Sequence, residues 1–281
     1  MDPLKTILDR FYREYDFKGR IAHDPIEFPR KYKDLRDIEV SGLIASCLAY
    51  GRVELFKPVI GRILDVMGKS PCDFVMSFDV AKNKQRFAGI KYRFNETEDI
   101  VCLIYMIKKL LLKYSSLEKA FMNFYGPADE NIGRGLSGLV AEFLEIDSSP
   151  VYGTDRKPAG LKQFLPSPAN GSACKRANLF LRWMIRDKDM DFGVWRDVPK
   201  DRLVIPLDTH IAKISLCLGL TRRKAQDWKA AVEITEALKK FDPEDPLKYD
   251  FALCHHGISG LCKGATDNGC RDCVFSSNPA S

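Results

Sequence analysis

The sequence lacks the long apolar runs that membrane insertion and secretion require. No apolar stretch in the 281 residues approaches the roughly 18 residues that a membrane-spanning helix needs. The opening segment, MDPLKTILDRFYREYDFKGR, is charged throughout and contains no apolar core of a signal peptide. We therefore expect a cytoplasmic protein with no membrane partner.

The sequence also lacks the alternation of apolar and polar residues that is typical of strands. No alternating run with turn signals on both sides is long enough for a strand, and no internal repeat or low-complexity tract is present. Valine and isoleucine lie instead in segments with helical spacing, such as residues 36–50 and 99–114. Asn95, followed by Glu98, predicts a capping box before the second of these segments. These patterns predict an all-α protein.

Histidine is scarce: the chain has 4, with no H-D doublet and no H-x-E-x-H arrangement. This scarcity disfavours a metal-dependent phosphohydrolase, for which Asp208, His210, His255 and His256 would be the candidate residues. Metal-dependent activity with an intact Lys175 would support that alternative. The 9 cysteines would suit a disulfide framework only in a small secreted chain, so we expect free thiols or metal ligands.

The charge of the chain is not strongly of one sign. The net charge of +6 permits a polyanionic partner without requiring one. Hydrophobic residues make up 45% of the chain and charged residues 29%, which is the composition of a globular protein with a real core.

Two motifs between Asn170 and His210 carry the candidate chemistry. The first, NGSACKRAN, is a turn-forming Asn-Gly that runs into an apolar helix with Lys175 at its start, and the second, LDTHI, places Asp208 at the start of another helix. The positive end of a helix disfavours an ammonium group, which suits Lys175 as an amine nucleophile. Taken singly, Lys175 would be a solvated lysine and Asp208 an ordinary N-cap. Taken together, in this order, they predict a catalytic pair.

The first motif resembles the hairpin of the helix-hairpin-helix DNA glycosylases, the superfamily of endonuclease III. That hairpin reads roughly L-P-G-V-G-R-K-T-A-N, and Gly171, Lys175, Ala177 and Asn178 keep its first glycine, lysine, alanine and asparagine. Ala173 stands in place of the second glycine. The second motif matches V-D-T-H-[VI], the family's segment with the catalytic aspartate, except at its first place.

The resemblance covers most of residues 36–273. Asp37–Arg52 is similar to the superfamily's early helix and DNA-contacting loop, and Ile90–Arg93 to its G-Y-R segment. Within the superfamily the chain is identified as a member of a bacterial branch, domain of unknown function 2400. The resemblance implies two helical lobes with a helix-hairpin-helix motif and a DNA-binding cleft between them. One lobe would be residues 38–185, ending in the hairpin, and the other residues 1–37 plus 186–281, so that Lys175 and Asp208 would face each other across the cleft.

The activity that the resemblance implies is that of a DNA glycosylase with AP lyase activity. It would be a monomer at the nucleoid that excises a damaged base, an oxidised base among the candidates, from double-stranded DNA through Lys175 and Asp208. The DNA contacts would come from Tyr50, Gly51, Arg52, Gly171, Ser172, Ala173, Arg176 and His210. The alternatives are a DNA-binding protein that keeps the hairpin without catalysis and, for Tyr50-Gly51-Arg52, a plain turn between helices.

The segment between the two motifs is longer than in endonuclease III and closer in length to that of the archaeal 8-oxoguanine glycosylases. Its aromatic residues, Phe192 and Trp195, would line the pocket for the base, since an extruded base is read between aromatic or apolar faces. The alternative role is packing of this segment onto its lobe.

The C-terminal cysteines resemble part of an iron–sulfur motif. Cys262, Cys270 and Cys273 are similar to the first three ligands of the C-x6-C-x2-C-x5-C motif that binds a [4Fe–4S] cluster in endonuclease III and its adenine-glycosylase relatives. The fourth ligand would fall near Pro279, so Cys254 would replace it, or His255 or His256 would complete a structural zinc site. Free thiols of a degenerate cluster are the other alternative, and no further cofactor is expected.

Overall fold

The protein is all-α. Its computed structural model describes residues 2–260, 262, 274 and 275, and every regular element in this part of the chain is a helix. The strand-like pairings among these residues are two isolated bridges, Tyr92 with Asn95 and Ser172 with Asp227. The sequence prediction of an all-α fold is therefore confirmed. No described helix has both the length and the apolar character needed to cross a membrane.

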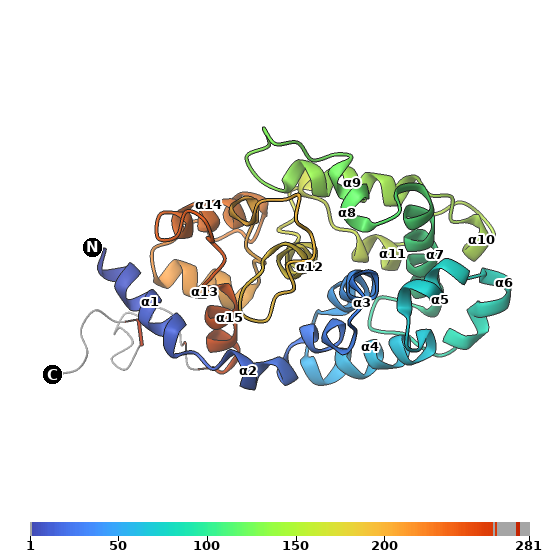
Figure 1. Ribbon diagram of the computed structural model, residues 1–281, viewed down its shortest axis with the longest axis horizontal. Coiled ribbons are helices and arrows are strands. Elements are labelled where there is room, and N and C mark those ends of the chain that lie inside the picture. Colours follow the sequence, from blue (N-terminus) through green and yellow to red (C-terminus); the bar gives the residue numbers. More distant parts are fainter. Residues whose placement is uncertain (1, 261, 263–273, 276–281) are drawn as a thin grey trace. The chain divides into compact units, whose positions relative to one another are not determined.

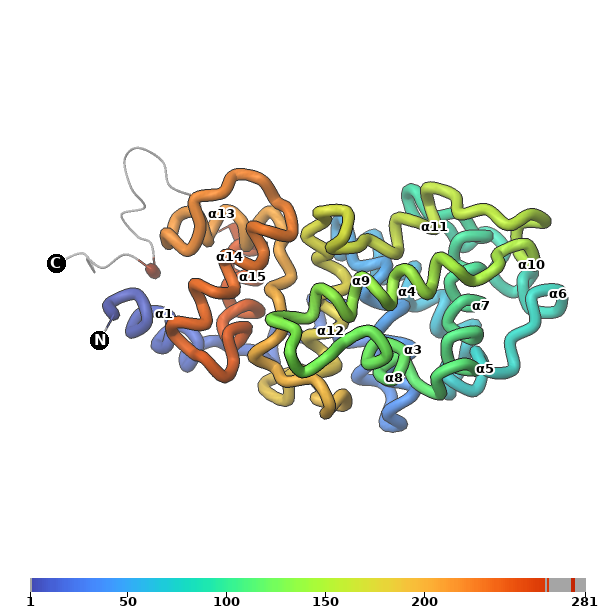
Figure 2. The backbone as a smooth tube through the Cα atoms, turned by 90° about the horizontal axis from the view of Figure 1, so that it is seen from above, coloured from blue at the N-terminus to red at the C-terminus, as the bar shows by residue number. Residues whose placement is uncertain are grey.

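The chain forms two compact units (Figures 1 and 2). Unit 1 is discontinuous and consists of Met1–Arg20 and Gly171–Ser281, whereas unit 2 is the continuous segment Ile21–Asn170. The sequence-based boundaries, at 38 and 185, differ from these. The structure places the whole helix that begins at Lys175 in unit 1, together with Asp208, so the pair is not divided between the two units.

The backbone explains why that helix belongs to unit 1. The segment after the helix folds back along it: the Phe192 N–H donates to the Trp183 carbonyl, and the Trp195 N–H donates to the Met184 carbonyl, each at 2.8 Å. These bonds satisfy amides of a segment that otherwise has little regular structure. No local pattern in the sequence specifies such a return.

Unit 2 is built from helices packed around α3 (Leu35–Leu48), which contacts α4 and α5 (Figure 1). Its other helices are α4 (Val53–Met67), α5 (Pro71–Ser77), α6 (Val80–Asn83), α7 (Thr97–Tyr114), α8 (Leu117–Met122), α9 (Gly133–Glu145), α10 (Ser149–Tyr152) and α11 (Ala159–Phe164). Short 3-10 turns lie at Ile21–His23, Pro25–Glu27, Pro29–Lys31, Lys84–Phe87 and Pro168–Asn170.

Two buried carboxylates on α3 accept hydrogen bonds from backbone amides in the first turns of neighbouring helices. Asp37 accepts a hydrogen bond from the Cys72 N–H in the first turn of α5, at 2.8 Å. Glu39 accepts from the N–H groups of Leu117 and Glu118 in the first turn of α8, each at 3.0 Å. Because the first amides of a helix have no partner within the helix, these bonds offset the desolvation of both acids.

The start of α7 differs from the sequence prediction by one residue. The N-terminal cap is Glu96, whose N–H donates to the Asp99 carboxylate at 2.9 Å, rather than Asn95 with Glu98. Asn95 is fully buried and is used elsewhere: its Nδ2 donates to the Gly160 carbonyl, and its Oδ1 accepts from the Tyr50 hydroxyl. The prediction failed because tertiary contacts, which spacing does not show, engage this side chain.

Unit 1 contains the helices that carry the candidate pair. They are α1 (Pro3–Glu14), α2 (Phe17–Arg20), α12 (Lys175–Ile185), α13 (Thr209–Cys217), α14 (Trp228–Lys239) and α15 (Asp250–Ile258), with a 3-10 turn at Lys200–Arg202. Helices α13 and α15 pack against each other and lie side by side in both Figure 1 and Figure 2. The N-terminal helix α1 is tied to the far end of the chain, because the Tyr249 hydroxyl donates to Asp9 at 2.6 Å.

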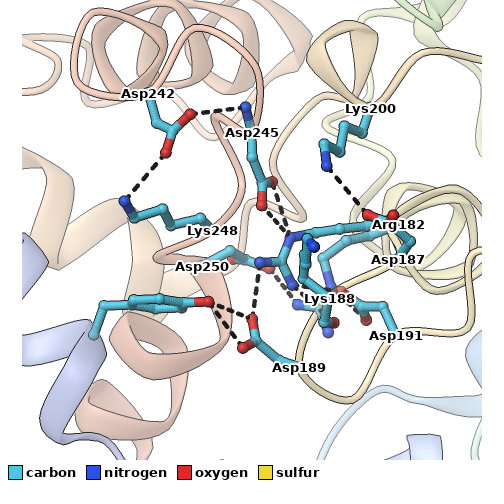
Figure 3. Close-up of polar contacts among 12 residues, drawn as sticks. Arg182, Asp187, Lys188, Asp189, Asp191, Lys200, Asp242, Asp245, Lys248 and Asp250 are labelled. Carbon is cyan, nitrogen blue, oxygen red and sulfur yellow. Dashed lines mark hydrogen bonds and ion pairs between the residues drawn. The ribbon is translucent and has the colours of Figure 1, made fainter.

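A buried set of ion pairs joins α12 to α15 (Figure 3). We call it the Arg–Asp cluster; its members are Arg182, Arg186, Asp189, Asp191, Asp245 and Asp250. Arg182 bridges Asp191 in the returning segment and Asp250 on α15. Burial raises the pKa of Asp250 to about 6, against the opposing effect of Arg182, and the negative charges of Asp208 and Asp191 add to the increase.

Candidate functional site

Lys175 begins α12 directly after a tight turn. Gly171 and Cys174 in this turn have positive φ angles, of 74° and 50°. No heavy atom lies within 4 Å of where a side chain at Gly171 would begin, so the glycine is needed for its backbone conformation rather than for space. The Cys174 N–H donates to the Ser172 hydroxyl at 3.2 Å. The conformation of the turn therefore sets the point at which Lys175 enters the helix.

The fully buried Asn178 holds this turn in place. Its Nδ2 donates to the Ala173 carbonyl at 3.1 Å and lies 3.4 Å from the carbonyl of Ile205, in the segment that leads to Asp208. The Gly171 carbonyl in turn accepts from the Trp228 N–H at 3.0 Å. Asn178 was identified in the sequence only as a residue that matches the hairpin motif. The structure gives it a role, which is to link the two motifs.

Asp208 is the N-cap of α13, and its two carboxylate oxygens have different partners. Oδ1 accepts hydrogen bonds from the N–H groups of His210 and Ile211, each at 2.9 Å. Oδ2 lies 3.3 Å from Nζ of Lys175 and 3.6 Å from Sγ of Cys254. One oxygen thus completes the helix, while the other belongs to the pair with Lys175.

The Lys175–Asp208 pair is partly open to solvent. The side chain of Lys175 is 36% exposed and that of Asp208 is 12% exposed. An amine beside a carboxylate can pass its proton to that carboxylate, and an exposed amine can then attack an electrophilic carbon. The structure thus places the two residues of the predicted pair in contact.

The other candidate residues of unit 1 lie around this pair. Gly171 is exposed, and Ser172, Ala173 and Arg176 are partly exposed in the turn and the first turn of α12. His210 lies in the first turn of α13, where its N–H is used by Asp208. The structure therefore brings the predicted phosphate-contacting segment of unit 1 next to the candidate catalytic pair.

Tyr50, Gly51 and Arg52 belong to unit 2, between α3 and α4. The Tyr50 hydroxyl, which donates to Asn95, also lies 3.0 Å from the Tyr92 carbonyl oxygen, and the Tyr92 hydroxyl donates to the Tyr50 carbonyl. A Cβ at Gly51 would lie 2.6 Å from the Arg93 guanidinium and 2.7 Å from the Tyr92 hydroxyl. Residues 50–52, which resembled a DNA-contacting loop in the sequence, and residues 90–93, which resembled the G-Y-R segment, are therefore packed on each other.

The turn at Arg93 and Phe94 was not predicted from the sequence as a surface feature. It is closed by the paired backbone bonds between Tyr92 and Asn95, each at 2.9 Å. Phe94 is 67% exposed at its tip, and the Arg93 guanidinium lies over the ring of Phe94, 5.6 Å from its centre. The Arg52 side chain is 81% exposed. Unit 2 thus presents an exposed aromatic ring with one arginine over it, and a second exposed arginine at position 52.

Trp195 lies in the core of unit 1. It is 2% exposed and packs edge-on against Phe180, with ring centres 5.5 Å apart. Phe192, by contrast, is partly exposed in the same returning segment. The geometry favours the packing role for Trp195 over the pocket role that the sequence also allowed.

Replacing Trp195 with alanine is accordingly expected to lower the free energy of unfolding by about 3–5 kcal/mol, since it removes a fully buried indole and leaves a cavity. Urea titrations followed by circular dichroism measure this change. Phe192→Ala is the comparison, and it should cost clearly less. Equal, small losses for both variants would contradict the packing role.

The predicted metal ligands are described only in part. Cys270 and Cys273 lie outside the described residues. Cys262 is 8% exposed, and its carbonyl accepts from Lys213, while Cys254 has its sulfur against Asp208. Within the described part of the chain, no three histidine, cysteine, aspartate or glutamate side chains are grouped to hold a metal ion.

The two histidines of α15 are packed among aromatic rings. His255 lies against Phe251, with ring centres 4.2 Å apart, and His256 lies edge-on to Phe11 and Phe275. Burial lowers the pKa of His256, so the neutral ring is favoured. Both histidine side chains therefore contribute to the packing of unit 1.

A comparison with protein families shows to which family the chain belongs. A family model described as "Protein of unknown function (DUF2400)" matches residues 24–259, a segment that contains the turn before α12, Lys175, Asp208 and Cys254. No curated protein and no solved structure matches the chain. Since the family model spans most of the sequence, the chain belongs to the DUF2400 family of proteins of unknown function.

Proposed function

We propose that the protein is a DNA glycosylase with AP lyase activity, which acts in the cytoplasm on nucleoid DNA that contains a damaged base. The observation that carries the proposal is the pair formed by Nζ of Lys175 and Oδ2 of Asp208, 3.3 Å apart, with each residue at the start of a helix. The likeness of both motifs to the helix-hairpin-helix glycosylases supports it. A panel of duplexes, each with a single lesion, tests it and identifies the base.

The pair suits the first chemical step. Asp208 takes a proton from Lys175, and the neutral amine attacks the anomeric carbon of the damaged nucleotide. The bond between nitrogen and that carbon forms while the bond to the base breaks, and the base leaves with the electron pair and takes the proton from Asp208, which becomes a carboxylate again. Positive charge builds on the sugar as the bond breaks, and the carboxylate of Asp208 stabilises it.

The covalent intermediate then leads to strand cleavage. The bond between the anomeric carbon and the ring oxygen breaks, and the ring oxygen takes a proton from the new secondary ammonium, which gives a Schiff base between Lys175 and the opened sugar. Removal of a proton from the adjacent carbon expels the 3′ phosphate by β-elimination, and water releases the enzyme.

DNA contacts are proposed for each unit separately. In unit 1, the backbone amides of Gly171–Ala173 and the side chain of Arg176 would contact phosphate, since amides before a helix bind anions without reading sequence. In unit 2, Arg52, Arg93 and the exposed ring of Phe94 form a surface that suits phosphates and an unstacked base. The enzyme is proposed to act as a monomer on double-stranded DNA.

Binding is expected to be mainly electrostatic. The logarithm of affinity should fall by about 0.9 per neutralised phosphate for each tenfold rise in salt. Arg52→Ala and Arg176→Ala should each lower this slope by about 0.9 if each residue neutralises one phosphate. Fluorescence anisotropy at several salt concentrations measures the slope.

The matched control for this measurement is Arg134→Ala, which removes an exposed arginine of α9 outside the proposed surface. It should leave the slope unchanged. An affinity that is flat with salt would contradict a nucleic-acid role for the protein.

A DNA-binding protein without catalysis is the second candidate function. One observation favours it: Oδ1 of Asp208 already has a structural role as the cap of α13, which does not require chemistry. In that case, variants of Lys175 and Asp208 would bind DNA as the wild type does, and the wild type would release no base from any lesion in the panel.

A metal at the C-terminal cysteines is proposed as a structural element rather than as part of the chemistry. An iron–sulfur cluster or a zinc ion held by Cys262, Cys270 and Cys273, with one further ligand, would pin the C-terminal segment to its unit. Elemental analysis of protein purified without oxygen should find iron or zinc. Absence of both metals from such a preparation would contradict a metal site.

A further inference from the structure

Helix α15 packs directly against the start of α13. A Cβ at Gly257 would lie 2.7 Å from the Cβ of His210, so only a glycine permits this approach. The residue one turn earlier on the same face of α15 is Cys254. The close packing therefore places this thiol at the N-terminal end of α13, where Asp208 lies.

The Cys254 thiol contacts Oδ2 of Asp208, the oxygen that faces Lys175, and not Oδ1, which caps α13. Its Sγ lies 3.6 Å from Oδ2, the oxygen that also faces Lys175, while Oδ1 is occupied by two backbone amides of α13. Together these contacts fix the rotation of the carboxylate group. Without the thiol, Oδ2 would be held on one side only, by a flexible lysine that must release its proton during the reaction.

The position of Cys254 is itself fixed by an ion pair one turn earlier on α15. Asp250 lies one turn before it on α15, is buried, and is paired with Arg182 of α12. The Arg–Asp cluster thus holds α15 against the helix that carries Lys175. The charge of Asp208 also contributes to the raised pKa of Asp250, which reflects how near the cluster lies to the pair.

We propose that Cys254 is a positioning residue for Asp208: its thiol donates to Oδ2 and holds that oxygen toward Lys175. The inference rests on the proposed function for its chemical meaning. A thiol is a weak donor, so it can orient the carboxylate while leaving Oδ2 basic enough to accept the proton of Lys175. A hydroxyl at the same place would donate more strongly and make the carboxylate less basic.

The first experiment needs no DNA. The carboxyl-carbon chemical shift of Asp208 is measured by NMR at one fixed pH on protein labelled at the aspartate carboxyl carbons, with the signal assigned by its loss in Asp208→Asn. In Cys254→Ala this signal should move, because a donor to the carboxylate is lost, and in Cys254→Ser, which keeps a donor, it should return toward its wild-type position. A protein that merely loosened would not show this return. The same signal position in all three proteins would overturn the proposal.

The second experiment measures single-turnover base release. Cys254→Ala should slow it about fivefold with unchanged DNA affinity, as expected for one weak hydrogen bond, and Cys254→Ser should recover most of the rate. The control is Cys217→Ala, which removes a half-buried thiol from the other end of α13 and should leave both measurements unchanged. A wild type that releases no base would contradict the proposed function, while the NMR signal of the Asp208 carboxyl carbon would still decide the contact.

The metal content separates this role from the one predicted for Cys254 in the sequence. Protein isolated without oxygen should hold the same iron and zinc in Cys254→Ala as in the wild type. Loss of metal in that variant would assign the thiol to a metal site and overturn the positioning role.

Discussion

Replacing Lys175 with glutamine is expected to abolish the covalent adduct that borohydride traps between the wild-type protein and a damaged duplex. Glutamine has nearly the length of the lysine stem, but its amide cannot form a Schiff base. DNA affinity should change little, because the turn amides at Gly171–Ala173 remain. Trapping followed by denaturing electrophoresis, with anisotropy for binding, measures both effects.

Lys229→Gln is the matched control, since Lys229 also lies in the first turn of a helix of unit 1, α14. This variant should form the adduct as the wild type does. If the adduct formed undiminished in Lys175→Gln, the assignment of the nucleophile would be wrong, whatever the activity of the enzyme.

The Asp208→Asn variant is expected to release the base about 10³-fold more slowly, with DNA binding retained or tightened. The amide keeps an oxygen for the N–H groups of His210 and Ile211, so α13 keeps its cap, and the melting temperature should change little. The lost quantity is the negative charge, which accepts the lysine proton and stabilises the sugar cation. Single-turnover kinetics and thermal melts separate the two contributions.

A second aspartate cap in unit 1 provides the control for this experiment. Asp227 caps α14 by accepting from the Ala230 N–H at 2.8 Å, and its nearest basic partner is Arg223. Asp227→Asn therefore makes the same chemical change at another helix start. Comparable losses of rate in both variants would show that the effect of Asp208→Asn comes from the helix and not from the reaction.

Local pattern was sufficient to predict the helical fold, whereas the pairing of Lys175 with Asp208 was predicted from two motifs that resemble those of the helix-hairpin-helix glycosylases. Apolar residues recur at helical spacing within each segment, and both Lys175 and Asp208 lie in motifs that place them at helix starts. The order of the motifs then made a joint role more probable than two separate ones. What the sequence could not provide was the distance between the two residues, because it depends on Asn178 and on the returning segment after α12.

The predictions that differed from the structure concern residues whose surroundings are built from distant parts of the chain. The unit boundaries differ from the predicted lobe boundaries because the segment around Phe192 and Trp195 forms backbone hydrogen bonds with α12. Asn95 is engaged by Tyr50 and Gly160 and so does not cap α7. The contact of Cys254 with Asp208 depends on α15 lying against α13, and periodicity within either helix contains no sign of it.

The discontinuity of unit 1 bears on how the protein is made. Unit 2 is one continuous segment, so all its residues have left the ribosome before most of unit 1 has been synthesised. Helix α1, although translated first, finds its partner Tyr249 only when α15 is about to emerge. Lys175, Asp208 and Cys254 are therefore brought together last, and a nascent chain can carry a folded unit 2 for some time before it has a candidate site.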